Sequence, residues 1–138
     1  MNMHIALCLL TRKAFLILVS LAFFTFSASA QRMMKTINDG WDFRKDGETR
    51  WQPINLPHTF NLDAYSQRNY YQGKGEYRKK LSLSEIAPTK RYYLKIDAAS
   101  KAADVKVNGQ VAGSHAGGYS AFILDVTGLI RENNEIEI

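Results

Sequence analysis

The stretch "VNGQVAGSHAGGYSAF", Val107–Phe122, decides how the fold is interpreted, because it combines closely spaced glycines with a histidine and a tyrosine. It is open to three interpretations: a phosphate-binding loop, a catalytic histidine in a flexible turn, or hairpins of a β-sheet. Its glycines lack the G-x-G-x-x-G spacing, and a strand-like pattern follows where a phosphate loop needs a helix. Asn108–Gly109 between valines is typical of a type I′ hairpin turn, in which both central residues have positive φ. The stretch therefore predicts antiparallel β-structure.

Segments on both sides of this stretch alternate apolar and polar residues with a period of two, as half-buried strands do. Turn dipeptides separate about six such segments. No segment has the pattern of a helix, although "DVTGLI" is compatible with a single helical turn. The pattern indicates an all-β fold, an antiparallel β-sandwich or a Greek-key barrel. The predicted inward positions are Trp41, Phe43, Tyr77, Lys79, Leu81, Leu83, Tyr92, Leu94, Ile96, Ala103, Val105, Val107, Phe122, Leu124, Val126, Ile136 and Ile138.

The first thirty residues have the pattern of a secretory signal peptide. Two basic residues, Arg12 and Lys13, precede the uncharged apolar run 14–26, and Ala28 and Ala30 form the A-x-A relation that signal peptidase reads. The run is shorter than the roughly 20 residues of a membrane-spanning helix. We therefore expect export to the periplasm or the extracellular space, with no membrane span after signal cleavage.

Residues 31–138 are predicted to form one small domain. The only cysteine, Cys8, lies in the signal segment, so this domain depends on a hydrophobic core rather than on disulfides. The whole chain has a net charge of +5, but its basic residues are scattered, which argues against a nucleic-acid partner. The sequence ends at Ile138 within a predicted strand. Because an unpaired apolar strand would leave an open edge, we expect the sandwich to be incomplete at its C-terminal strands.

Two histidines of this domain are candidates for chemistry. His58 lies in the proline-bounded loop "NLPHTFN" and lacks a second ligand at metal-site spacing, so it is predicted to be a hydrogen-bonded structural residue rather than a metal ligand. His115 follows Ser114, but no nucleophile elbow of the G-x-S-x-G type is present. No metal or cofactor is expected.

Carboxylates are the remaining candidates for chemistry, because sugar hydrolysis uses a pair of them. The dipeptide Asn134–Glu135 is similar to the one that carries the acid/base of many retaining glycosidases, but here it alternates with isoleucines, which favours a solvated strand face. Asp63 is a better polar candidate for binding. It lies in a loop rich in amides and aromatic rings, which suit the hydroxyls and C–H faces of sugars. The other residues of this type in the loop are Asn61, Tyr65, Asn69, Tyr70 and Tyr71.

Several blocks resemble glycoside hydrolase family 2, which contains β-galactosidases, β-glucuronidases and β-mannosidases. They are "INDGWDFRKDG", "WQPINLPHTFN", "RNYYQGKGEYRKKL", "LKIDAASKAADVKVNGQVAGSHAGGYSAFILDVTGLI" and "RENNEIEI". They occur in order over residues 37–138. Glu76 and Lys106 stand where tryptophan is common in the family.

The resemblance implies the N-terminal sugar-binding domain, a jelly-roll-like antiparallel sandwich, of an exported retaining β-glycosidase, most similar to a β-galactosidase. It also implies that the two catalytic glutamates lie in a barrel downstream, so this chain alone is expected to be inactive and to contain no catalytic residue. The expected partners are a β-glycoside and the downstream domains. By position, the resemblance assigns sugar binding first to Asn69 and then to Asp63. A free-standing carbohydrate-binding module and an adhesion domain without a sugar site remain alternatives.

Overall fold

The computed structural model describes residues 32–61 and 70–138. The chain divides into two compact units, residues 1–36 and 37–138, and the eight described strands all lie in the second. No helix forms in the described ranges, so none there is long and apolar enough to span a membrane. The strands are β1 (Trp41–Lys45), β2 (Gln52–Ile54), β3 (Gly75–Ser82), β4 (Tyr93–Ile96), β5 (Ala102–Val107), β6 (Gln110–Ala116), β7 (Phe122–Asp125) and β8 (Asn133–Glu137).

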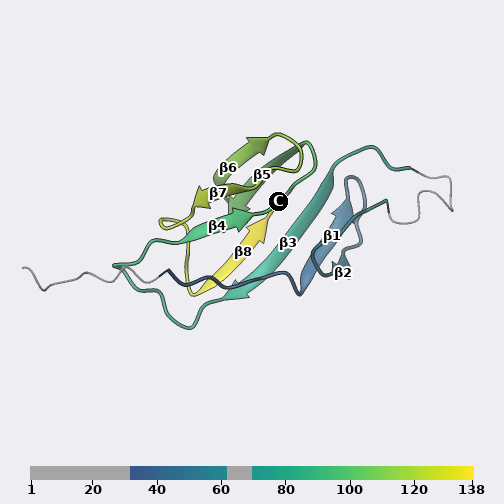
Figure 1. Ribbon diagram of the computed structural model, residues 1–138. Coiled ribbons are helices and arrows are strands. Elements are labelled where there is room, and N and C mark those ends of the chain that lie inside the picture. The colour runs from purple at the N-terminus through teal and green to yellow at the C-terminus, as the bar shows by residue number, and fades with distance from the viewer. Residues whose placement is uncertain (1–31, 62–69) are drawn as a thin grey trace, which may run out of the picture. The chain divides into compact units, whose positions relative to one another are not determined.

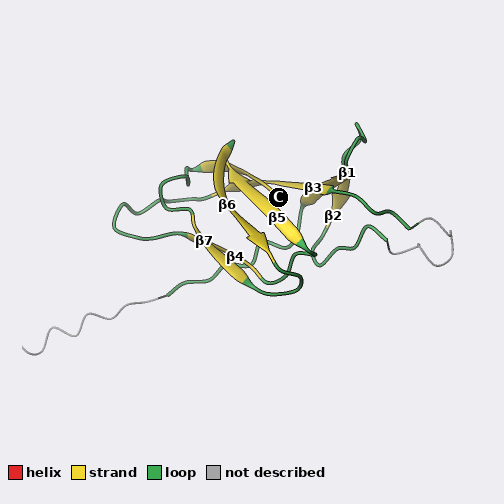
Figure 2. Ribbon diagram, turned by 90° about the horizontal axis from the view of Figure 1, so that it is seen from above, coloured by secondary structure: helices red, strands yellow, loops and turns green. Residues whose placement is uncertain are grey.

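The strands form two antiparallel sheets (Figure 1). The larger sheet has six strands in the order β2-β1-β3-β8-β5-β6, and the smaller sheet pairs β4 with β7. Figure 2 shows the β4–β7 pair lying against the larger sheet, next to β5 and β6. Non-consecutive neighbours such as β3–β8 and β5–β8 bring distant parts of the sequence together. The predicted all-β antiparallel sandwich is confirmed.

The core lies between the sheets. Trp41, Val107, Val126 and Ile136 are at most 3% exposed and form one buried cluster. Partly buried residues from both sheets pack against this cluster, among them Tyr77, Leu81, Leu94 and Leu124. These are the inward positions of the period-two pattern, so the alternation identified the buried face of the strands that it predicted.

The predicted turn at Asn108–Gly109 is present, with φ of 55° and 76°, and Val107 pairs with Gln110 across it. One strand, β2, was missed, and β6 is longer than the predicted hairpin required. Strand β2 contains Pro53 and lies at the sheet edge, where a missing N–H is tolerated. Strand β6 continues to Ala116, and a register shift opposite Val105/Lys106 lets it pass through Gly113.

The expectation of an unpaired final strand is wrong. Strand β8 lies inside the six-stranded sheet, paired with β3 on one side and β5 on the other. Even Ile138 exchanges backbone hydrogen bonds with Tyr77, at 2.9 and 3.0 Å. The open-edge argument failed because sequence order does not reveal that β8 inserts between two earlier strands.

Candidate functional site

The predicted sugar-binding residues Asp63 and Asn69 both lie outside the described residues, so their roles stay predictions. The residues at the two ends of that loop are described. The side-chain amide of Asn61 accepts a hydrogen bond from the backbone N–H of Tyr71 and donates one to its carbonyl, both at 2.9 Å. This paired contact joins the two ends of the loop in the way that a strand ladder would.

An aromatic cluster supports the base of the same loop. The ring of Phe43, from β1, lies 4.6 Å from His58, 5.7 Å from Phe60 and 4.9 Å from Tyr77, measured between centroids. Phe60 also contacts Tyr71 edge-on at 5.6 Å. The Phe43 ring fits here because Gly75, the register partner of Lys45, has no side chain: a Cβ there would be 2.7 Å from the Phe43 ring. The loop is therefore attached to the most buried part of β1 and β3.

His58 is hydrogen bonded within this cluster, as the sequence predicted. Its Nδ1 lies 3.0 Å from the hydroxyl of Tyr77. Burial lowers the pKa of His58 and raises the pKa of Tyr77, because each charged form would lose hydration. Both groups are therefore held neutral near pH 7, which suits hydrogen bonding and packing rather than charge-based catalysis.

Next to the loop, Tyr70 is exposed, whereas the hydroxyl of Tyr71 donates to the Lys74 carbonyl at 2.8 Å. Tyr70 is thus the described aromatic ring here that remains open to solvent. A tyrosine ring offers an apolar face for a sugar and a hydroxyl for its polar groups. The described residues thus give residues 62–69 fixed flanking positions, with one exposed aromatic ring beside them.

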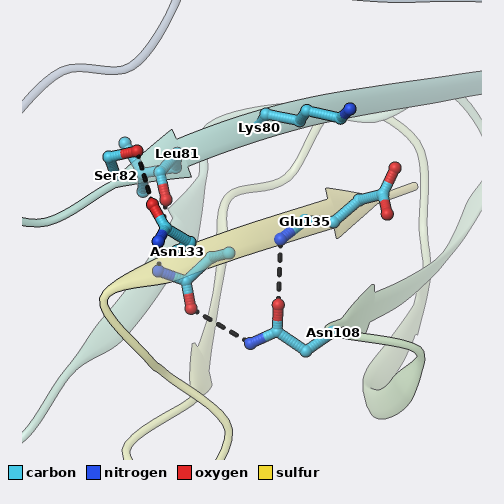
Figure 3. A pocket seen from close by; sticks show the side chains of 7 residues that line it. Lys80, Leu81, Ser82, Asn108, Asn133 and Glu135 are labelled. Atoms are coloured by element: carbon cyan, nitrogen blue, oxygen red, sulfur yellow. Dashed lines mark hydrogen bonds between the residues drawn. The ribbon is translucent and has the colours of Figure 1, made fainter.

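A separate hollow of about 410 Å³ lies on the larger sheet, between β3, β8 and the β5–β6 turn (Figure 3). Asparagine amides occupy its floor. Asn108 donates from Nδ2 to Oδ1 of Asn134 at 3.0 Å and to the Leu129 carbonyl at 2.8 Å, and its own Oδ1 accepts from the Glu135 N–H at 2.9 Å. These hydrogen bonds of the Asn108 side-chain amide join the hairpin turn to β8.

Asn134 is 4% exposed, and its amide is fully used. It accepts from the Arg131 N–H at 2.7 Å and donates to the carbonyls of Arg131 and Leu81 at 2.5 and 3.3 Å. Glu135 is on the opposite face of the strand and pairs in register with Lys80. The dipeptide Asn134–Glu135 is therefore a structural element of β8, in agreement with the strand-face interpretation, although Asn134 itself is buried.

His115 fixes a turn rather than activating Ser114. Successive side chains of β6 point to opposite faces, so Ser114 and His115 diverge. The Nε2–H of His115 donates to the Gly117 carbonyl at 3.2 Å and lies 3.0 Å from Oγ of Ser120, and the ring stacks on Phe122 at 4.4 Å. His115 is therefore a hydrogen-bonded residue of this bend, and Tyr119 within the bend is exposed.

Sequence reasoning missed one charged arrangement. Arg44–Glu76 and Arg78–Asp42 are ion pairs at 2.5 and 3.1 Å, each between direct register partners of β1 and β3. The guanidinium carbons of both arginines lie over the ring of Trp51, 4.4 and 4.1 Å from its centroid. No sequence signal identifies these contacts, since strand register alone brings the residues together.

Within residues 32–61 and 70–138, no three His, Cys, Asp or Glu side chains gather in a way that could hold a metal ion.

No family model matches the sequence. A β-glucuronidase of Bacteroides fragilis is 37% identical over 124 residues, which cover 84% of this chain and 18% of that protein. A β-galactosidase of Thermoanaerobacter pseudethanolicus is 32% identical over 101 residues, 71% of this chain and 13% of that protein. The crystal structure of Bacteroides uniformis β-glucuronidase superimposes with a TM-score of 0.71 at 39% identity, covering 78% of this chain and 14% of that one.

The chain thus spans less than a fifth of the length of the curated relatives that it matches. The matching region has the same all-β fold in the solved structures. The resemblance found in the sequence blocks is confirmed: the chain is related to a small β-sandwich domain of the β-glucuronidases and β-galactosidases of glycoside hydrolase family 2.

Proposed function

We propose that this chain is the N-terminal sugar-binding part of an exported retaining β-glycosidase. The observation that carries the proposal is the joint similarity, in sequence and in fold, to one small domain of much longer glycosidases. In retaining enzymes one carboxylate attacks the anomeric carbon and a second protonates the leaving oxygen. We assign both carboxylates to a downstream domain, and to this domain the shaping of the sugar pocket.

Of the possible substrates, β-glucuronides are our first choice and β-galactosides the alternative. The sequence alone favoured a β-galactosidase-like enzyme, and two relatives carry that name. The relative with 37% identity and the superimposed structure with 39% identity are both named β-glucuronidases. The higher identity to the named β-glucuronidases than to the two named β-galactosidases is the reason for placing β-glucuronides first.

The loop between Asn61 and Tyr71 is the part of this domain that we assign to the sugar. Asn69 and Asp63 are its proposed hydroxyl-binding residues. The Asn61–Tyr71 contact and the aromatic cluster below it support the assignment, because they hold both ends of the loop at fixed positions. Export through the signal peptide of residues 1–30 is part of the proposal and rests on the sequence pattern.

Hydrolysis assays test the proposal. The gene should be cloned with the DNA downstream of the codon for Ile138, and its product assayed on nitrophenyl β-glucuronide and nitrophenyl β-galactoside. We expect hydrolysis, faster with the glucuronide, by a product with a downstream barrel, and none by the 138-residue chain. Hydrolysis by the 138-residue chain, or a stop codon after a completed sandwich, would contradict it. A faster reaction with the galactoside would select the alternative substrate.

A further inference from the structure

Three non-glycine residues in the described ranges have a left-handed backbone, with φ of 60° at Lys101, 55° at Asn108 and 65° at Tyr119. Asn108 is explained by the type I′ turn, which favours asparagine. Lys and Tyr rarely adopt this conformation, since their Cβ atoms approach the following carbonyl too closely. Residues held in such strained conformations are concentrated at functional sites.

The two unexplained residues lie on turns that touch each other. Lys101 is in the β4–β5 turn and Tyr119 in the β6–β7 turn, and the N–H of Gly117 donates to the Lys101 carbonyl at 2.8 Å. The second turn is further fixed by the His115 contacts to Gly117 and Ser120. The two turns that carry the strained residues are therefore held against each other by backbone and side-chain hydrogen bonds.

The tyrosine side chain does not account for its own backbone strain. Its ring is 83% exposed, and within the described residues it forms no hydrogen bond or ring contact. Glycine, which would adopt the same φ freely, occupies the two preceding positions. The Tyr119 side chain thus makes no hydrogen bond or ring contact with the described residues of the domain, which indicates a contact with a molecule outside it.

The chemistry of the pair indicates the contact. A tyrosine ring stacks on the C–H face of a pyranose, and its hydroxyl can bond a sugar hydroxyl. The Lys101 ammonium is exposed, and no described carboxylate lies within ion-pair distance of it. We propose that the Lys101–Tyr119 turns bind a uronic-acid unit of a glycan, with the ring on Tyr119 and the carboxylate on Lys101. The choice of a uronic acid rests on the proposed function.

A protein partner fits this surface less well. Stable protein interfaces bury about 800 Å² on each side around an apolar centre. Apart from Lys101 and Tyr119, these turns (residues 97–101 and 117–121) contain only glycine, alanine, serine and Asp97, so they carry a single large ring. One ring with a nearby cation is the scale of a sugar contact.

The test is an NMR titration of the purified chain with methyl β-D-glucuronide, and with methyl β-D-glucoside as the uncharged comparison. We expect amide shifts at Lys101 and at residues 117–120, and about two- to fivefold weaker binding of the glucoside, because an exposed ion pair changes Kd by about that factor. Tyr119→Asn should weaken glucuronide binding by about tenfold, and Lys101→Asn by about two- to fivefold. Tyr93→Ala and Lys106→Gln, which change an exposed tyrosine and lysine elsewhere, should leave it unchanged.

Thermal unfolding gives an independent readout, because asparagine tolerates the left-handed conformation better than tyrosine does. Tyr119→Asn should unfold at the same Tm as the parent or a few degrees higher. A lower Tm would show that the ring stabilises the domain and would overturn the proposal. The proposal would also be overturned if the amide shifts were equal for both sugars or absent from these turns. The same holds if the shifts depended on protein concentration in the absence of sugar.

The result of the sugar titration can be distinguished from the result of the hydrolysis assay that tests the proposed function. In the longer gene product, Tyr119→Asn should leave hydrolysis of nitrophenyl β-glucuronide unchanged, since this small substrate needs no second sugar contact. Failure of the titration with hydrolysis intact would remove the Lys101–Tyr119 site alone. Absence of hydrolysis with the titration intact would remove the enzyme assignment and leave a uronate-binding module.

Discussion

The side-chain amides of Asn108 and Asn134 meet at 3.0 Å, although 26 residues separate them in the sequence. One sits at the tip of the β5–β6 hairpin and the other is buried in β8. Through these two side chains the hairpin, the last strand and the turn at Leu129 are held together. Each remaining amide atom has a backbone partner, so the pair replaces backbone pairing where the strands diverge.

Asn134→Ala should destabilise the domain by about 3 kcal/mol, because it leaves several buried backbone groups without partners. Urea unfolding would measure this. Asn108→Gly, which retains the turn, should lose about 1 kcal/mol, and the double variant should lose less than the sum. Asn133→Ala is the matched control, since this exposed neighbour bonds only Ser82. Equal losses at Asn133 and Asn134 would contradict the structural role of the amide network.

Gly113→Ala should lower stability by about 1–3 kcal/mol, because overpacking displaces neighbouring side chains. A Cβ at this position would lie 2.7 Å from Cδ2 of Leu124 across the sandwich. Gly128→Ala is the control, since nothing lies within 4 Å of the Cβ that it adds. Combining Gly113→Ala with Leu124→Val should recover part of the loss. Full stability of Gly113→Ala would show that β6 and β7 are not packed this closely.

Trp51→Ala should destabilise the domain by about 1–2 kcal/mol, because it exposes two ion pairs and removes two cation–π contacts. Arg50→Ala, which changes an exposed neighbour, should have no measurable effect. Chemical unfolding of the two variants in parallel separates these outcomes. A negligible effect of Trp51→Ala would mean that the arginines find equivalent contacts with solvent.

Stability should decrease between neutral and mildly acidic pH, in part through His58. Burial lowers its pKa in the folded state, so the unfolded chain takes up the proton first as the pH falls. The contribution is complete above about 6.5, the ordinary value, and is lost as the pH falls through the folded-state pKa. Urea unfolding at pH 7.5 and pH 5 should show a smaller difference for His58→Gln than for the parent.

Tyr77→Phe distinguishes the cause of this pH dependence. The variant removes the hydrogen bond to His58 but keeps the ring that buries it. Because desolvation causes the shift, the pH dependence should persist in Tyr77→Phe. Its loss in this variant would assign the effect to the hydrogen bond instead.

Asn69→Ala, made in a gene product with hydrolase activity, should raise KM by about tenfold, the value of one hydrogen bond to a sugar hydroxyl. The Tm should stay within about 2 °C, since the role proposed for Asn69 is sugar binding and not packing. Asn38→Ala serves as the control for an exposed amide outside the loop. Unchanged kinetic constants would remove Asn69 from the sugar site.

The sequence by itself determined the sheet character, the inward positions and the family. Period-two alternation is a local property of a strand, so it identified Trp41, Val107 and Ile136 as core residues without knowledge of their partners. Asn108–Gly109 likewise predicted its own turn, because left-handed backbone angles are a property of the two residues.

Only the tertiary structure decided which strands are neighbours, and therefore which polar residues are buried and what they contact. The insertion of β8 between β3 and β5 buries Asn134 and brings it to Asn108, and the register of β1 with β3 places two arginines under Trp51. These contacts depend on strand order and pairing register, which are set by the packing of the whole core. Such long-range relations leave no periodic signal in the residues that form them.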